Sequence, residues 1–127
     1  MPFDNPYQSS FGDVERLWDA QRCIASRGDW VQGRFQDGDR HCLVAALSIA
    51  AGSRSFNMPN RLERRLARLL ATELPPTTFW ARMNFLTRRL RLMWFNDDPG
   101  TRHEDVMALF DRTIGHLTNA HPVSVST

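Results

Sequence analysis

An apolar segment near the middle of the chain constrains the fold more than any other feature. Every residue from Cys42 to Ala51 except Ser48 is apolar, and Gly52 follows directly. A segment of this length that ends at glycine is typical of a short helix, because glycine readily adopts the left-handed conformation that closes a helix. A helix that is apolar on all sides is normally buried. We therefore expect Cys42–Ala51 to form the centre of the domain, with other helices packed around it.

Four further segments show apolar residues at helical spacing. They comprise residues 13–26, 59–74, 77–93 and 101–118. Thr77 or Thr78 is expected to cap the third of these, and Thr101 with Glu104 fits a capping box at the fourth. The short pattern Trp30–Phe35 is followed by Asp37-Gly38, which favours a tight hairpin turn. The predicted fold class is mainly α: a compact single-domain bundle of about five helices with one small β-hairpin near Trp30–Cys42.

The length of 127 residues indicates one domain. We expect a flexible N-terminal arm over residues 1–10, a globular helical domain over 11–118 and a C-terminal tail over 119–127. No apolar run is long enough to cross a membrane, and the first residues do not resemble a signal peptide, so the expected location is cytoplasmic. In a reducing compartment Cys23 and Cys42 are expected to be free thiols, with Cys23 as a small apolar filler.

Positive charge is concentrated in the middle of the sequence. All sixteen basic residues are arginine, and residues 54–91 carry nine of them against Glu63 and Glu73, although the whole chain has a net charge of only +2. This middle segment either neutralises the acidic ends of the chain or faces an anionic partner. The candidate contact residues lie on the two predicted helices there: Arg61, Arg64, Arg65, Arg68, Arg88, Arg89 and Arg91.

Two turn-to-helix junctions hold most of the residues capable of chemistry. Cys42 begins a helix, where the helix dipole can stabilise a thiolate, and His41 precedes it. A cysteine nucleophile also needs a base that a third group orients. His103, Asn96 and Asp97 could complete such a set only if the second junction folds against the first. The alternatives are that Cys42 is simply buried, that Asn96 and Asp97 stabilise a turn, and that His103 is solvated.

Four blocks of residues, considered together, resemble a known family. The blocks are Trp30-x-Gln32-Gly33, Cys42-Leu43-x-Ala45-Ala46-Leu47-x-x-Ala50, Asn96-Asp97-x-Pro99-Gly100 and Glu104-Asp105-Val106-x-Ala108-Leu109-Phe110-Asp111-Arg112-x-Ile114. In order and spacing they are similar to a family of small bacterial and phage proteins of unknown function, over roughly residues 12–118. Residues 54–92 match least, and Ala45 stands where the family has glycine. The resemblance implies no reaction, ligand or catalytic residue.

The absence of a complete catalytic set favours a non-enzymatic interaction module with an arginine-rich surface and an acidic protein partner. The alternatives are a nucleic-acid-binding protein that uses the same arginines and a cysteine-dependent enzyme or redox protein centred on Cys42. We expect no cofactor and no metal, since the histidines and cysteines lack the spacing of a zinc site. Oligomer assembly through Phe79, Trp80 and Trp94 is a further possibility if these aromatic residues form an exposed patch.

Overall fold

A computed structural model describes residues 6–75 and 87–119 of the chain, with side chains described from residue 12 onward. Over these residues the protein contains five α-helices, one short 3-10 turn and one two-stranded antiparallel hairpin. The elements are α1 (Pro6–Cys23), η1 (Arg27–Asp29), β1 (Gln36–Asp37), β2 (Arg40–His41), α2 (Leu43–Ala51), α3 (Arg61–Thr72), α4 (Arg88–Asp97) and α5 (His103–Asn119). The predicted fold class is confirmed.

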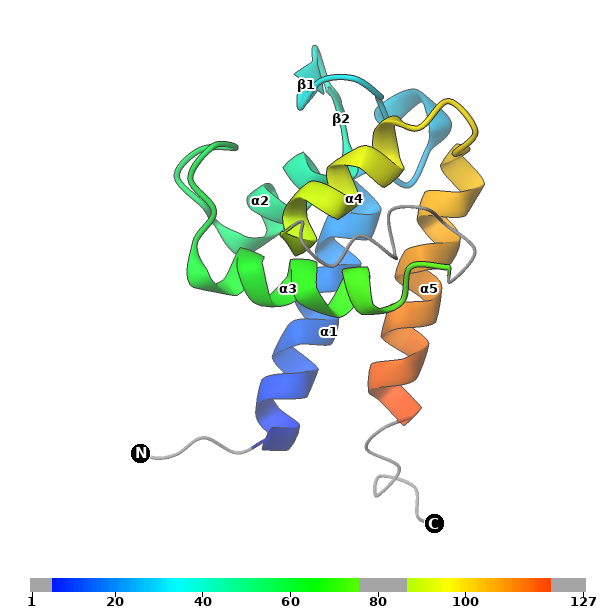
Figure 1. Ribbon diagram of the computed structural model, residues 1–127. Helices are drawn as coiled ribbons and strands as arrows, with labels where there is room; N and C mark the ends of the chain where they lie inside the picture. Colours follow the sequence, from blue (N-terminus) through cyan, green and yellow to red (C-terminus); the bar gives the residue numbers. More distant parts are fainter. Residues whose placement is uncertain (1–5, 76–86, 120–127) are drawn as a thin grey trace.

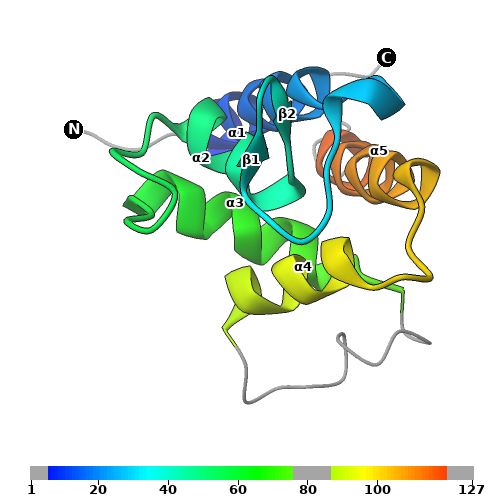
Figure 2. The same cartoon turned by 90° about the horizontal axis from the view of Figure 1, so that it is seen from above.

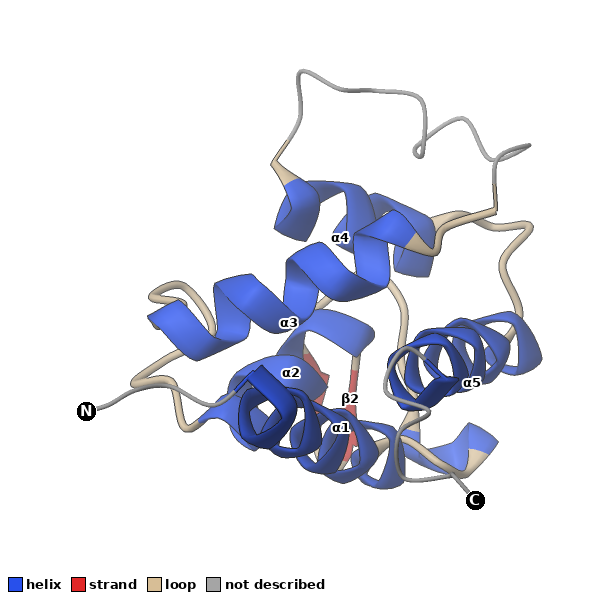
Figure 3. Ribbon diagram, turned by 90° about the horizontal axis from the view of Figure 1, so that it is seen from below, coloured by secondary structure: helices blue, strands red, loops and turns tan. Residues whose placement is uncertain are grey.

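The helices are arranged in layers around α2 (Figure 1). Helices α1 and α5 run side by side in opposite directions, and α3 crosses them. Helix α4 packs on the side of α3 that faces away from α1, as Figures 2 and 3 show. Helix α2 contacts α1, α3 and α4, so it lies where the layers meet. No helix of the described segments is both long enough and apolar enough to span a lipid bilayer.

Helix α2 has the central position that the sequence predicts. Its residues from Leu43 to Ser48 are all buried. The Sγ atom of Cys42 caps its first turn by accepting a hydrogen bond from the Ala45 amide, and Gly52 closes its end in the left-handed conformation with φ of 72°. Burial is not complete along the whole helix, because Ile49 near its end is 49% exposed. The prediction of a wholly buried segment is therefore wrong for its last turn, which reaches the surface.

Helix α1 begins and ends earlier than the periodicity predicts. It starts at Pro6 instead of residue 13, so residues 6–10 of the expected arm are helical. Proline fits this position because its fixed φ suits the first turn of a helix. The helix ends at Cys23 because Ser26 caps the following 3-10 turn through a hydrogen bond from the Gly28 amide to its Oγ.

The hairpin lies within the predicted region, but its strands are displaced toward the C-terminus. Gln36 pairs with His41 and Asp37 pairs with Arg40, so Gly38 stands in the turn with φ of 64°. The Trp30–Phe35 segment is not part of either strand. It contacts the hairpin through a hydrogen bond from the Val31 amide to the His41 carbonyl. A pair of strands this short needs support from neighbouring elements.

Helices α3 and α4 differ in how well their bounds were predicted. Asn60 caps α3 by accepting a hydrogen bond from the Glu63 amide at 2.8 Å, close to the expected start. One helix over residues 77–93 was expected, but Thr87 has an extended backbone and caps α4, which then continues to Asp97. The apolar spacing hid this boundary because it runs on past Thr87. Thr77, Thr78, Phe79 and Trp80 lie outside the described residues.

Helix α5 begins one residue later than the predicted capping box requires. Asp105, not Glu104, accepts a hydrogen bond from a backbone amide before the helix, that of Arg102. The Thr101 amide instead donates to the Asp98 carbonyl at 2.9 Å, which keeps Thr101 in the turn. The predicted apolar stripe is confirmed, with Val106, Phe110 and Ile114 buried and Leu117 packed against the core.

Candidate functional site

The two junctions do fold against each other, and Asn96 joins them. Its side chain is completely buried. The Oδ1 atom accepts hydrogen bonds from Trp30 Nε1 at 2.6 Å and from the Leu43 amide at 3.1 Å. The Nδ2 group donates to the Val31 carbonyl at 3.1 Å and to Asp97 Oδ1 at 2.9 Å. One amide therefore connects the end of α4, the segment before the hairpin and the start of α2.

Gln32 and Gly33 complete the contact from the other junction. Gln32 Nε2 lies within hydrogen-bond distance of the carbonyls of Asn96, Asp98 and Thr101, at 2.8, 2.9 and 3.3 Å. The Gly33 amide donates to Asp97 Oδ1 at 2.8 Å, and its φ of 84° suits glycine. Asn96 and Asp97 are thus engaged in holding the turn after α4, which is the structural role that the sequence favours.

Cys42 lies in an environment that keeps its thiol neutral. It is only 4% exposed. Burial is the main cause that raises its pKa, and the charge of Asp97 adds to the effect, against opposing hydrogen bonds from backbone amides. With Gly33, Asp97 and other residues it lines a small hollow of about 170 Å³. A raised pKa is the opposite of what a nucleophilic thiol requires.

The histidines are placed away from the Cys42 sulfur. His41 Nδ1 lies 4.0 Å from Sγ of Cys23, and His103 Nε2 lies 2.7 Å from the Ile24 carbonyl. In the described segments no histidine nitrogen is within hydrogen-bond reach of Cys42 Sγ. The expectation of a solvated His103 is wrong, because its ring is half-buried beside Trp30. Sequence reasoning missed both contacts because they arise from packing between distant segments.

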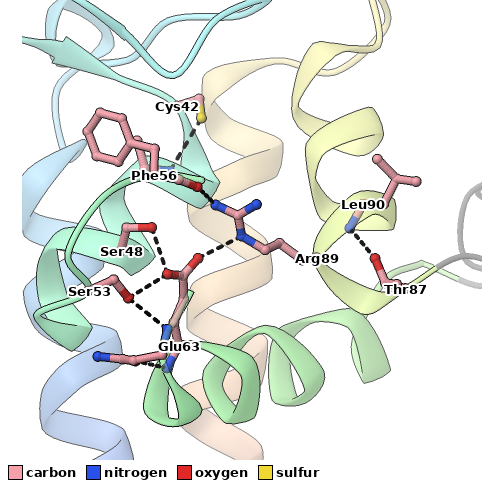
Figure 4. Close-up of polar contacts among 10 residues, drawn as sticks. Cys42, Ser48, Ser53, Phe56, Glu63, Thr87, Arg89 and Leu90 are labelled. Atoms are coloured by element: carbon pink, nitrogen blue, oxygen red, sulfur yellow. Dashed lines mark hydrogen bonds and ion pairs between the residues drawn. The ribbon is translucent and has the colours of Figure 1, made fainter. Parts of the chain in front are cut away.

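Glu63 is a further residue that sequence reasoning did not single out. Its side chain is completely buried on α3, and Figure 4 shows how other elements converge on it. Ser48 and Ser53 each donate a hydrogen bond to Oε1 at 2.7 Å, and Arg89 Nε pairs with Oε2 at 2.8 Å. Arg89 also donates to the Phe56 carbonyl. The only sequence signal was the position of Glu63 in the first turn of α3, three residues after the cap Asn60.

The seven predicted contact arginines divide into two that pair with buried carboxylates, four that are exposed and one that is half-buried. Arg65 and Arg89 form ion pairs with Asp13 and Glu63, each at 2.8 Å and each with a buried carboxylate. The exposed arginines on α3 and α4 are Arg61, Arg64, Arg68 and Arg88. Arg91 on α4 is half-buried. Carboxylates therefore neutralise two arginines of the middle segment, while four others keep their charge at the surface.

Six of these arginines surround one hollow of about 600 Å³ between α3 and α4. The arginines of its lining are Arg61, Arg64, Arg65, Arg68, Arg88 and Arg89. Pro59, Ala67 and Thr87 complete the described lining, so no acidic side chain of the described segments lines it. The described residues also contain no group of three or more histidines, cysteines or acidic side chains arranged to hold a metal ion.

The fold and these contacts define a small, mainly α-helical protein that is organised around one buried helix and carries an arginine-lined hollow. The chain belongs to a family of unknown function, DUF6197, whose model matches residues 13–116. The resemblance that the four sequence blocks indicate is thereby confirmed as a family relationship. No curated protein and no solved structure shows a significant match to this chain.

Proposed function

We propose that this chain is a non-enzymatic interaction module of the cytoplasm, and that its arginine-lined hollow binds an acidic segment of a partner protein. The observation that carries the proposal is the set of arginines that surrounds one hollow of about 600 Å³ between α3 and α4. Arginine is the side chain best suited to such contacts, because its planar guanidinium group binds a carboxylate through two parallel hydrogen bonds.

The charge balance inside the hollow supports an anionic occupant. Asp13 and Glu63 each neutralise one lining arginine. Arg61, Arg64, Arg68 and Arg88 have no ion pair or side-chain hydrogen bond with other described residues. Four cations that line one hollow and have no ion partner among the described residues raise the local concentration of anions and favour their association.

The competing functions have less support. Nucleic-acid binding would use the same arginines, but a duplex needs a basic surface that follows its phosphates, and here the charge surrounds a hollow while the whole chain has a net charge of +2. A cysteine-dependent enzyme would need an ionised Cys42, but burial raises the pKa of this thiol. Nucleic-acid binding is an outcome of the experiment below, whereas the alkylation rate of Cys42 tests the cysteine-dependent enzyme.

The proposal is tested by fluorescence anisotropy with a labelled glutamate-rich peptide and a labelled single-stranded oligonucleotide as probes. The triple variant Arg61→Glu, Arg64→Glu, Arg68→Glu should bind the peptide at least about tenfold more weakly than the wild type, because like charges then face each other. The matched control reverses three exposed arginines elsewhere that also have no ion pair with described residues: Arg27, Arg34 and Arg54. Circular dichroism verifies that both variants are folded.

Three results would contradict the proposal. The first is that the wild-type protein binds no peptide at low salt. The second is that both triple variants lose the same affinity, since net charge alone would then explain the effect. The third is that the oligonucleotide binds more tightly than the peptide, with an affinity that falls steeply between about 50 mM and about 200 mM salt, which would assign the surface to nucleic acid.

A further inference from the structure

We infer that the hollow between α3 and α4 recognises a multiply charged phosphate group. The inference rests on the proposed function and specifies the chemistry of the bound anion. Its basis is the set of arginines that line the hollow: Arg61, Arg64 and Arg68 repeat every three or four residues along α3, so they share one face of that helix. Arg88 comes from the first turn of α4, and all four line the same hollow.

The remaining two arginines form a fixed part of the lining. Arg65 donates to Asp13 through both Nε and Nη2, at 3.1 and 2.8 Å. Arg89 reaches from α4 to Glu63, whose other oxygen is held by Ser48 and Ser53 (Figure 4). Because these contacts orient the two side chains in advance, the two arginines lose less conformational entropy when a ligand binds than free side chains would.

The start of α4 adds to the positive potential of the hollow. The N-cap Thr87 and the first two residues of the helix, Arg88 and Arg89, belong to the lining. The first turn of α4 contains no acidic residue. The first amides of a helix have no acceptor within the helix, and the helix dipole places a partial positive charge there. The start of α4 therefore adds positive potential to that of the four arginines that have no ion pair with described residues.

A phosphate group matches this arrangement better than a single carboxylate. A carboxylate carries one charge and is satisfied by one guanidinium fork. A phosphate monoester carries about −1.5 to −2 charges near neutral pH and three acceptor oxygens, so it can engage several guanidinium groups from different directions. The hollow of about 600 Å³ is of the size of typical small-ligand sites, about 300–1,000 Å³. It can thus hold a phosphate together with part of the molecule that carries it.

The phosphate can be carried by a phosphorylated side chain of the partner or by a small organic phosphate. Titration calorimetry distinguishes these sources with three probes: inorganic pyrophosphate, a phosphoserine peptide with flanking glutamates, and the same peptide with glutamate in place of phosphoserine. We expect the phosphopeptide to bind about tenfold more tightly than its glutamate counterpart, since charge-assisted bonds to phosphate are stronger and more numerous. Pyrophosphate should compete with it.

A charge-conserving variant separates guanidinium recognition from simple attraction. Arg64→Lys with Arg68→Lys keeps both positive charges but removes the planar fork. This variant should lose several-fold affinity for the phosphopeptide and for pyrophosphate, while its affinity for the glutamate peptide changes little. The matched control is Arg27→Lys with Arg54→Lys, two exposed arginines that also have no ion pair with described residues. Neither pair of lysines is expected to alter the fold.

The outcomes are separable. Pyrophosphate binding as tight as that of the phosphopeptide supports a small organic phosphate, and tighter phosphopeptide binding supports a phosphorylated partner. If the two peptides bind equally and the lysine variant loses nothing, the phosphate inference fails while the proposed function stands. If no probe binds, both fail. If a single-stranded oligonucleotide binds more tightly than all three probes, the hollow is part of a nucleic-acid surface and the inference is overturned.

Discussion

At the scale of single residues, the side chain of Asn96 supplies hydrogen-bond partners to two backbone groups and to one ring N–H group. The Leu43 amide belongs to the first turn of α2, where helical amides have no acceptor of their own. The Val31 carbonyl lies in an irregular segment before the hairpin, and Trp30 presents a ring N–H group. Asn96 pairs these three groups through three hydrogen bonds, and its fourth hydrogen bond goes to Asp97. Buried polar groups of this kind are costly when they lose their partners.

We expect Asn96→Ala to lower the free energy of unfolding by about 3 kcal/mol, because it leaves two donors and one acceptor buried without partners. Urea unfolding followed by tryptophan fluorescence measures the change. Asn57→Ala is the matched control, since Asn57 is exposed and should change stability by less than about 0.5 kcal/mol. Equal losses in the two variants would show that Asn96 does not hold the junctions together.

The thiol of Cys42 provides a prediction about pH. Burial raises its pKa in the folded state above the ordinary value of 9.0, so the unfolded chain loses this proton first. Stability from the buried neutral thiol is therefore complete below pH 9.0 and is lost as the pH rises through the folded-state pKa. In a Cys23→Ser background, we expect iodoacetamide to alkylate Cys42 more slowly in the folded protein than in urea.

Two comparisons test this thiol prediction. Further replacement of Cys42 by Ala should flatten the decline in unfolding free energy above pH 9.0, because the group that titrates is then absent. Faster alkylation of the folded protein than of the unfolded chain at pH 8 would instead mean that Cys42 is an activated nucleophile. That result would restore the hypothesis of a cysteine-dependent enzyme.

At the scale of secondary-structure elements, the buried ion pair between Glu63 and Arg89 fastens α4 to α3. It is the described contact in which a charged group of α4 meets a completely buried carboxylate. The same carboxylate also binds Ser48 on α2 and Ser53 after it. Three elements thus depend on one acidic side chain, and their relative positions shape the hollow that Arg89 lines.

We expect Arg89→Met to destabilise the protein by about 3 kcal/mol, because the Glu63 carboxylate then remains buried without its cation. Adding Glu63→Gln to this variant should restore part of the loss, with a coupling energy of about 1–2 kcal/mol in a double-mutant cycle. Urea unfolding provides all four stabilities. Arg16→Met, on the exposed face of α1, should be nearly neutral. Strictly additive effects of the Arg89 and Glu63 changes would reject the coupling.

The elements show what the sequence could predict and where local patterns failed. Helix α2 was predictable because its apolar residues and Gly52 both indicate the same short buried helix. The start of α4 was not, since Leu86, Leu90 and Met93 continue a helical spacing across Thr87. Which side chain completes a cap depends on how the preceding turn folds, and this is why the cap of α5 falls one residue beyond the predicted position.

At the scale of the whole molecule, the uneven charge of the sequence resolves into internal pairing and an exposed remainder. Arg65 binds Asp13 from the acidic N-terminal part, whereas Arg61, Arg64, Arg68 and Arg88 remain exposed around the hollow. The sequence indicated which arginines could face a partner but not which would be paired internally. That distinction depends on the crossing of α1, α3 and α4, which brings together residues far apart in the chain.

The same long-range packing limits how much of the candidate site could be predicted. Asn96 and Asp97 stood out because they precede Pro99-Gly100, yet nothing local indicated that Asn96 would bond to Trp30 and Leu43. Glu63 gave no sign of complete burial, because acidic residues in the first turn of a helix are usually exposed and interact with its dipole. Long-range partners of polar side chains are set by tertiary structure.

On helix α3, the residues that pack in the core and the residues that face the solvent occupy separate positions. Leu66, Ala67 and Leu70 face the core, while Arg61, Arg64 and Arg68 point outward. A combinatorial library that randomises only the outward positions would therefore leave the buried face intact. Selection from such a library could redirect the protein to new ligands while the scaffold itself remained unaltered.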